Sequence, residues 1–243
     1  MRSQFVRRAA TPLAVGAAIF MPSLAMADLL IFTGPDGLSA EADVTLVNAT
    51  TVEIRLRNTS TGVPLGFTAA DQLLTGFSWD ASAVGINGSD VQITGGTIVT
   101  GPTSFSLNFS ITDVGPNANI GGEWGWSNID GSGLLPNFIS GNTSSATPFG
   151  GPNLDGPVSL NGPQAGLYSA AHPVALGGLG AIEDELIATV TLNMAIDSLD
   201  ELFANGARVE FGSSGYFVDL PAPSAAVALL GGLLGLRRRR RTA

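Results

Sequence analysis

Residues 51–57, Thr-Val-Glu-Ile-Arg-Leu-Arg, alternate between apolar and polar side chains. Successive side chains of a β-strand point to opposite faces of its sheet, so Val52, Ile54 and Leu56 would share one face and the charged residues the other. One face of such a strand is buried and the other meets solvent. The segment therefore predicts a half-buried β-strand.

Alternation of period two extends outward from this segment. Residues 42–48 show it as well, and a turn at 48–50 would join the two segments into a hairpin. Further strands are expected at 75–79, 91–94, 97–99, 104–112, 186–195 and 208–212. The alternation is most regular in 104–111, and only 198–204 has the pattern of a short helix.

Many short strands separated by turns of Gly, Asn, Ser and Thr indicate an all-β fold. The expected architecture is an antiparallel β-sandwich, of Ig-like or jelly-roll topology, that forms one ectodomain over residues 28–218. Within it, residues 131–163 contain seven glycines and five prolines and show little alternation. This segment is expected to be a long loop, either functional or disordered.

Charge divides the 243-residue chain into three segments. All 20 acidic residues and only three of the 11 arginines lie between residues 28 and 219, which gives this central segment a net charge of −17. A segment this acidic repels phosphate groups, so we expect no nucleic-acid binding. The chain has no cysteine and only one histidine, which excludes disulfides and thiolate metal sites and argues against zinc sites.

The N-terminal segment, residues 1–27, has the three parts of a secretory signal peptide. Basic residues precede an apolar run at about 13–21, and Ala25 and Ala27 then supply the small-x-small pattern that signal peptidase accepts. Cleavage would fall between Ala27 and Asp28. The alternative is a buried N-terminal helix.

The C-terminal segment, residues 219–243, combines a proline hinge, an apolar run and a basic tail. The apolar run at 225–236 would form a helix about 18 Å long, which is short for a hydrocarbon core of about 30 Å. Arginines next to a membrane segment stay in the cytoplasm, so both ends would place the central segment outside the inner membrane. The tail consists of Arg237, Arg238, Arg239, Arg240 and Arg241.

This C-terminal arrangement resembles the sorting signal of PEP-CTERM bacterial surface proteins. In that family a Pro-Glu-Pro motif precedes an apolar helix and a basic tail, and Pro221, Pro223 and Ser224 match the motif, whereas Ala222 replaces its glutamate. The resemblance implies transient attachment to the inner membrane and processing by an exosortase-type transpeptidase. A sortase signal, a GPI signal and a plain tail anchor are the alternatives.

Trp124 and Trp126 are candidates for binding a glycan. In a strand both rings would lie on one face, with Glu123 on the other, and exposed aromatic rings pack well on the apolar face of a pyranose. The alternative is that both rings belong to the core.

Catalytic chemistry finds little support in the sequence. Glu123 with Asp113 or Asp130 could form a glycosidase pair, but with 20 acidic residues such pairs arise by chance. His172 is followed by proline and is expected to lie exposed in a loop. We therefore expect no enzyme, and a secreted hydrolase is the third hypothesis.

Calcium is the more credible ion, although no cofactor is required by any motif. Loop oxygens occur at 36–37, 128–131, 153–156 and 183–185, but none of these segments has EF-hand spacing. The acidic run 183–185 is expected to be a solvated loop.

The sequence thus predicts an exported bacterial protein of the cell surface or extracellular matrix, with a structural or adhesive role and exopolysaccharide as a candidate partner. The alternative is a carbohydrate-binding surface module that uses exposed tryptophans.

Overall fold

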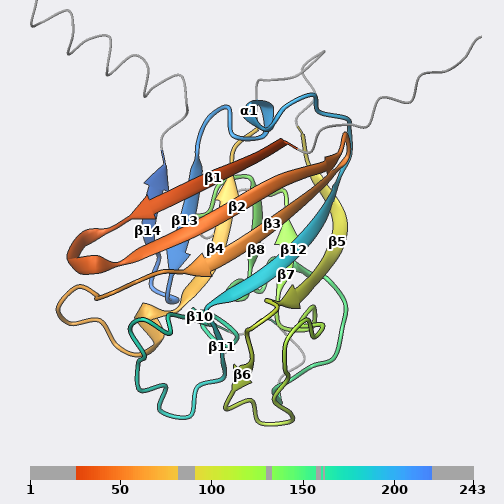
Figure 1. Ribbon diagram of the computed structural model, residues 1–243. Coiled ribbons are helices and arrows are strands. Elements are labelled where there is room, and N and C mark those ends of the chain that lie inside the picture. The colour runs from red at the N-terminus through yellow and green to blue at the C-terminus, as the bar shows by residue number, and fades with distance from the viewer. Residues whose placement is uncertain (1–25, 82–90, 130–132, 157–159, 161, 221–243) are drawn as a thin grey trace, which may run out of the picture.

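The computed structural model describes residues 26–81, 91–129, 133–156, 160 and 162–220. These residues form two β-sheets whose apolar faces pack against each other, and one short helix, α1 (Leu199–Leu202), lies near the strand that begins at Met26 (Figure 1). The prediction of a mostly β fold with antiparallel sheets is confirmed. The pair β10–β11 is parallel, which the sequence did not predict.

The first sheet has five antiparallel strands and contains the hairpin that the sequence predicted. In spatial order its strands are β1 (Met26–Thr33), β2 (Ser39–Asn48), β3 (Thr51–Asn58), β12 (Glu185–Leu192) and β5 (Ile93–Thr100). The turn between β2 and β3 is stabilised by Asn48, whose side-chain oxygen accepts a hydrogen bond from the Thr50 amide at 3.0 Å. Every second side chain of β2 and β3 is buried for most of their length, as the alternation requires.

The second sheet has nine strands and is built around β4 (Leu74–Trp79). β4 pairs with β13 on one side and with β8 and β10 on the other. The other strands are β6 (Ser106–Leu107), β7 (Gly125–Ser127), β8 (Asn137–Ser140), β9 (Thr147–Pro148), β10 (Leu167–Tyr168), β11 (Ala181–Glu183), β13 (Ala207–Phe211) and β14 (Tyr216–Leu220). Two 3-10 turns, η1 (Pro35–Gly37) and η2 (Ala70–Gln72), lie in connecting segments.

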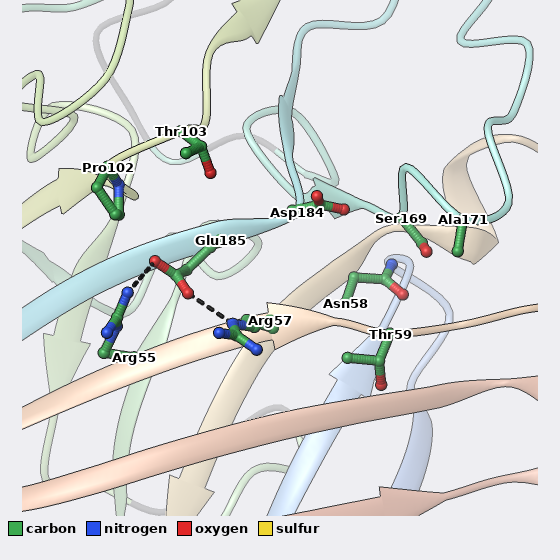
Figure 2. A pocket seen from close by; sticks show the side chains of 10 residues that line it. All are labelled: Arg55, Arg57, Asn58, Thr59, Pro102, Thr103, Ser169, Ala171, Asp184 and Glu185. Atoms are coloured by element: carbon green, nitrogen blue, oxygen red, sulfur yellow. Dashed lines mark hydrogen bonds and ion pairs between the residues drawn. The ribbon is translucent and has the colours of Figure 1, made fainter.

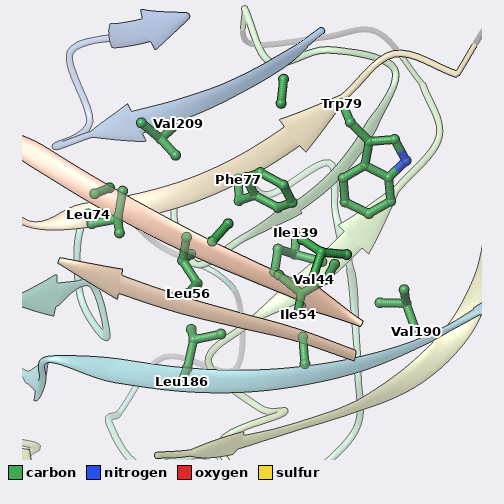
Figure 3. Packing of buried hydrophobic residues seen from close by; sticks show 14 of the residues in the cluster. Val44, Ile54, Leu56, Leu74, Phe77, Trp79, Ile139, Leu186, Val190 and Val209 are labelled. Carbon is green, nitrogen blue, oxygen red and sulfur yellow. The ribbon is translucent and has the colours of Figure 1, made fainter. Parts of the chain in front are cut away.

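The main hydrophobic core lies between the two sheets. Phe77 and Trp79 of β4 point towards the apolar faces of β2, β3 and β12 (Figure 3). The ring of Phe32 on β1 meets the Phe77 ring edge-on, with centroids 6.1 Å apart. Both tryptophan and phenylalanine are fully buried here, so the contact removes a large apolar area from water.

A smaller cluster covers the opposite face of the nine-stranded sheet. It contains Leu134, Phe138, Ala146 and Leu160, with Phe217 packed against it. The first four belong to the Gly/Pro-rich segment 131–163. The described part of this segment contains β8 and β9 and buries apolar side chains, so it forms an ordered covering layer.

The prediction of a strand over 104–112 was wrong for most of that segment. Only Ser106 and Leu107 form a strand, because Asn108 adopts a left-handed backbone conformation with φ of 64°. The Asp113 carboxylate then accepts hydrogen bonds from the Ser106 hydroxyl and the Phe109 amide. These bonds close a turn, so the alternating side chains do not share a sheet.

The two strands predicted at 91–94 and 97–99 are one strand, β5, which continues through Gly95 and Gly96. A Cβ at Gly96 would collide with the Thr189 carbonyl oxygen of β12, so glycine at this position allows close pairing. The other predicted strands occur with shifted ends, and the predicted helix at 198–204 is shorter and occurs as α1.

The predicted signals lie mainly outside the described residues. Of the signal-peptide cleavage residues, Ala27 and Asp28 belong to β1, and Ala25 is not described. The residues of the sorting signal, 221–224 and 237–241, and the apolar run 225–236 are not described either. No helix among the residues that the structure describes is long and apolar enough to cross a membrane.

Glu210 of β13 is a buried carboxylate beneath the covering layer. It is 2% exposed, and its Oε1 accepts a hydrogen bond from the Asn142 amide at 3.0 Å, whereas its Oε2 has no partner among the described residues. Burial raises the pKa of Glu210 to about 7, although the bond from Asn142 opposes this effect.

We expect stability to depend on pH through Glu210. Its folded-state pKa is raised, so its contribution is fully present below about pH 4.5 and is lost as the pH rises through about 7. Glu210→Gln removes this titration and should stabilise the protein relative to wild type by up to about 3 kcal/mol more at about pH 8 than at about pH 5. Urea unfolding at the two pH values measures the difference.

The control for this experiment is Asp200→Asn, since Asp200 is exposed on α1. It should leave the wild-type pH profile unchanged. Parallel pH profiles for Glu210→Gln and wild type would contradict the assignment.

Candidate functional site

A polar pocket lies at one end of the five-stranded sheet. It has a volume of about 390 Å³ and is formed by the end of β3, the start of β12 and the loops that follow β5 and β10 (Figure 2). The lining residues are Arg55, Arg57, Asn58, Thr59, Pro102, Thr103, Ser169, Ala171, Asp184 and Glu185.

Glu185 joins the two arginines of this pocket. Its Oε1 accepts a hydrogen bond from Arg55 Nη2 at 2.9 Å, and its Oε2 accepts one from Arg57 Nε at 2.6 Å. Glu185 pairs directly with Arg57 in the register of β12 and β3, and Arg55 lies two residues along the same strand face. The hydrogen bond that Arg57 donates to Glu185 raises the pKa of Arg57 above its usual value.

The carboxylate of this ion cluster is buried, whereas its two guanidinium groups meet solvent. The Glu185 side chain is only 7% exposed, whereas those of Arg55 and Arg57 are 35% and 48% exposed. A Cβ at Gly101 would stand 2.7 Å from Glu185 Oε1, so only glycine leaves room for the carboxylate there. The prediction that 183–185 is a solvated loop was therefore wrong for Glu185, which begins β12.

Asn58 and Asp184 form hydrogen bonds that hold the segments around the pocket in place. The Asn58 amide donates hydrogen bonds to the carbonyl oxygens of Gln72 and Leu167, at 3.1 and 2.7 Å, and so ties β3 to the nine-stranded sheet. The Asp184 carboxylate accepts a hydrogen bond from the Ala170 amide at 2.7 Å. The pocket thus offers guanidinium donors beside carboxylate and hydroxyl acceptors, a combination suited to a ligand rich in hydroxyl groups.

The tryptophan pair that the sequence suggested does not form an exposed platform. Trp124 is fully buried and donates a hydrogen bond from its indole Nε1 to the Ala165 carbonyl oxygen at 2.9 Å. Trp126 is partly buried against the main core, and Glu123 is 4% exposed. Trp124 therefore offers no face to a glycan.

The other candidate residues are dispersed. His172 lies in the loop after β10 and is half-buried near Asn58 of β3, not exposed as the sequence predicted, and Asp36 lies in the turn η1. The Asn128 side chain is occupied by hydrogen bonds to both backbone groups of Ile93, whereas Asp130 lies outside the described residues. Among the described residues, no group of three or more Asp, Glu or His side chains could hold a metal ion.

From the sequence, Asp184 and Glu185 were candidates only for binding calcium, and nothing connected them with the arginines of this pocket. Arg55 and Arg57 were assigned only to a polar strand face, although they are two of the three arginines of the central segment. Because arginine is scarce in this segment, the presence of two arginines on one strand face could have indicated a binding site here.

Comparison with known proteins does not identify a family for this chain. A scan against protein-family models found no match, and searches of curated proteins and of solved structures found none.

The ion cluster leads to a prediction about stability. Glu185→Gln keeps the shape of the side chain but leaves two guanidinium groups without their shared counter-charge. We expect a loss of about 1–3 kcal/mol in the free energy of unfolding, reduced from the value for a fully buried pair because both arginines meet solvent.

Glu41→Gln is the matched control for this substitution. Glu41 lies 3.6 Å from Arg57 Nη1 on the more exposed side of the cluster, and its loss should cost no more than about 0.5 kcal/mol. Equal effects of the two substitutions in urea unfolding would show that the buried bridge has no special role.

Proposed function

We propose that this is an exported bacterial protein, displayed at the cell envelope or released into the extracellular matrix, with an adhesive or structural role. Its ectodomain would be a β-sandwich, cleaved from a signal peptide and directed by the PEP-CTERM-like tail through an exosortase-type system. The proposal rests on the acidic central segment between two basic ends.

The positions of the first and last described strands, β1 and β14, support display. Met26 pairs with Leu46, which pairs with Val52, so the start of β1 lies at the end of the sheet opposite Arg57. Leu220 ends β14 in the upper part of Figure 1, where β1 also starts. A membrane attachment through the C-terminal tail would therefore direct the pocket away from the membrane.

The pocket is the best candidate for an adhesive contact. Arg55 and Arg57 are balanced by Asp184 and Glu185, so the lining has no net charge, and the strongly acidic segment around it repels polyanions. These features favour an uncharged polysaccharide over an acidic one. The polar pocket therefore takes the place of the tryptophan-based carbohydrate site, because Trp124 is buried.

No observation favours the secreted hydrolase. Glu185 already accepts a hydrogen bond from each of two guanidinium groups, so it is poorly placed to transfer a proton. We therefore assign the pocket a binding role.

Export is tested by cell fractionation and by the intact mass of the mature protein. We expect a chain that begins at Asp28 and is found in the envelope or the medium. Loss of the arginine tail as well would show processing near Pro223, whereas its retention would show a lasting anchor. An intact chain with its leader in the cytoplasm would overturn the proposal.

The adhesive role is tested by affinity electrophoresis in gels that contain dextran, a neutral polymer, or alginate, an acidic one. Dextran should retard the wild type more than alginate does, and Arg57→Ala should reduce the retardation about tenfold by removing a donor from the pocket. Arg208→Ala, which alters the other sheet, should bind as wild type. Retardation that is equal in all three proteins would exclude the pocket as the binding site.

A further inference from the structure

Asp155 is a buried carboxylate without a hydrogen-bond donor. It is 2% exposed, and neither of its carboxylate oxygens has a partner among the described residues. An ionised carboxylate in such surroundings is strongly unfavourable unless a proton or a cation neutralises it. Burial accordingly raises the pKa of Asp155.

A second buried carboxylate, that of Glu123, lies next to it. Glu123 Oε1 accepts a hydrogen bond from the Leu154 amide at 2.5 Å, and the Asp155 amide also donates to this carboxylate. Desolvation raises the pKa of Glu123, and the negative charge of Asp155 raises it further. Two carboxylates from segments 32 residues apart in the chain thus converge beneath the surface.

No arginine of the described residues forms an ion pair with Glu123 or Asp155. The three arginines of the described residues are engaged elsewhere: Arg55 and Arg57 with Glu185, and Arg208 with Asp219. The arginines of the described residues therefore provide no positive charge for this pair.

The two backbone segments that carry these carboxylates lie close together. A Cβ at Gly121 or Gly122 would collide with the carbonyl oxygens of Gly150 or Pro152, so glycine at these positions allows the two segments to approach closely. Calcium accepts carbonyl oxygens together with carboxylates in irregular geometry, whereas magnesium demands a near-ideal octahedron.

We propose that Glu123 and Asp155 bind one calcium ion, with backbone carbonyl oxygens and water completing its coordination. The ion would join segment 150–155 to segment 120–124 beside β7. With only two carboxylates the site is weak, with a Kd of about 10⁻⁴–10⁻³ M, as in extracellular calcium-binding modules. This calcium site is separate from the polar pocket and does not depend on the function proposed for it.

The test is thermal unfolding of the purified protein with millimolar calcium or with EDTA, near pH 7.5. Calcium in tenfold excess over its Kd should raise the Tm by roughly 3–5 °C. Asp155→Asn should abolish this shift. Glu210→Gln, which alters a buried carboxylate at another place, should retain it.

A second measurement covers the case in which Asp155→Asn does not fold. Terbium(III) added to the wild type should give luminescence when tryptophan is excited, and calcium should displace it. A wild-type Tm that is the same in calcium and EDTA, or terbium luminescence that calcium does not displace, would overturn the proposal and leave a shared proton as the neutralising charge.

Discussion

The contact between the apolar face of the five-stranded sheet and Phe77 and Trp79 of β4 is the interaction on which the rest of the structure depends. It brings β2, β3 and β12 over the central strand of the other sheet, with the Phe77 and Trp79 ring centroids 5.5 Å apart (Figure 3). Because side chains alternate along a strand, burial of Ile54 and Leu56 in this core fixes Arg55 and Arg57 on the outer face. The core thereby positions the polar pocket as well.

Because arginine is scarce in the described residues, the buried carboxylates differ in whether a cation neutralises them. Glu185 is neutralised by two guanidinium groups, whereas Glu210, Glu123 and Asp155 are buried without any cation from the described residues. For Glu210, which stands alone, burial raises the pKa to about 7, so a proton is sufficient to neutralise it. Glu123 and Asp155 lie next to each other, so the proposed calcium ion would neutralise both at once.

How much of the fold could be predicted depended on whether a strand has one buried face. The segments 42–48, 51–57 and most of 186–195 alternate because one side faces the core and the other does not, and the structure confirms them as strands. β8 is buried on both faces and so has no period of two, and it lies in a segment that was interpreted as a loop. The segment 104–112 alternates, but the left-handed Asn108 interrupts it.

The candidate site was less predictable than the fold for a related reason. Glu185 and Arg57 are far apart in the sequence, and their contact follows from the register of β12 against β3, which local periodicity does not encode. The burial of Trp124 was likewise decided by packing, since its indole could have faced either way in a short strand.

The sequence by itself determined the separation of an acidic central segment from two basic ends, the mostly β fold, and the faces that β2 and β3 bury. These properties depend on composition and on the alternation of neighbouring side chains. Only the tertiary structure decided that Glu185 joins two arginines, that Glu123 meets Asp155, and that Trp124 is buried. Those arrangements depend on contacts between segments distant in sequence, which form only when the two sheets pack together.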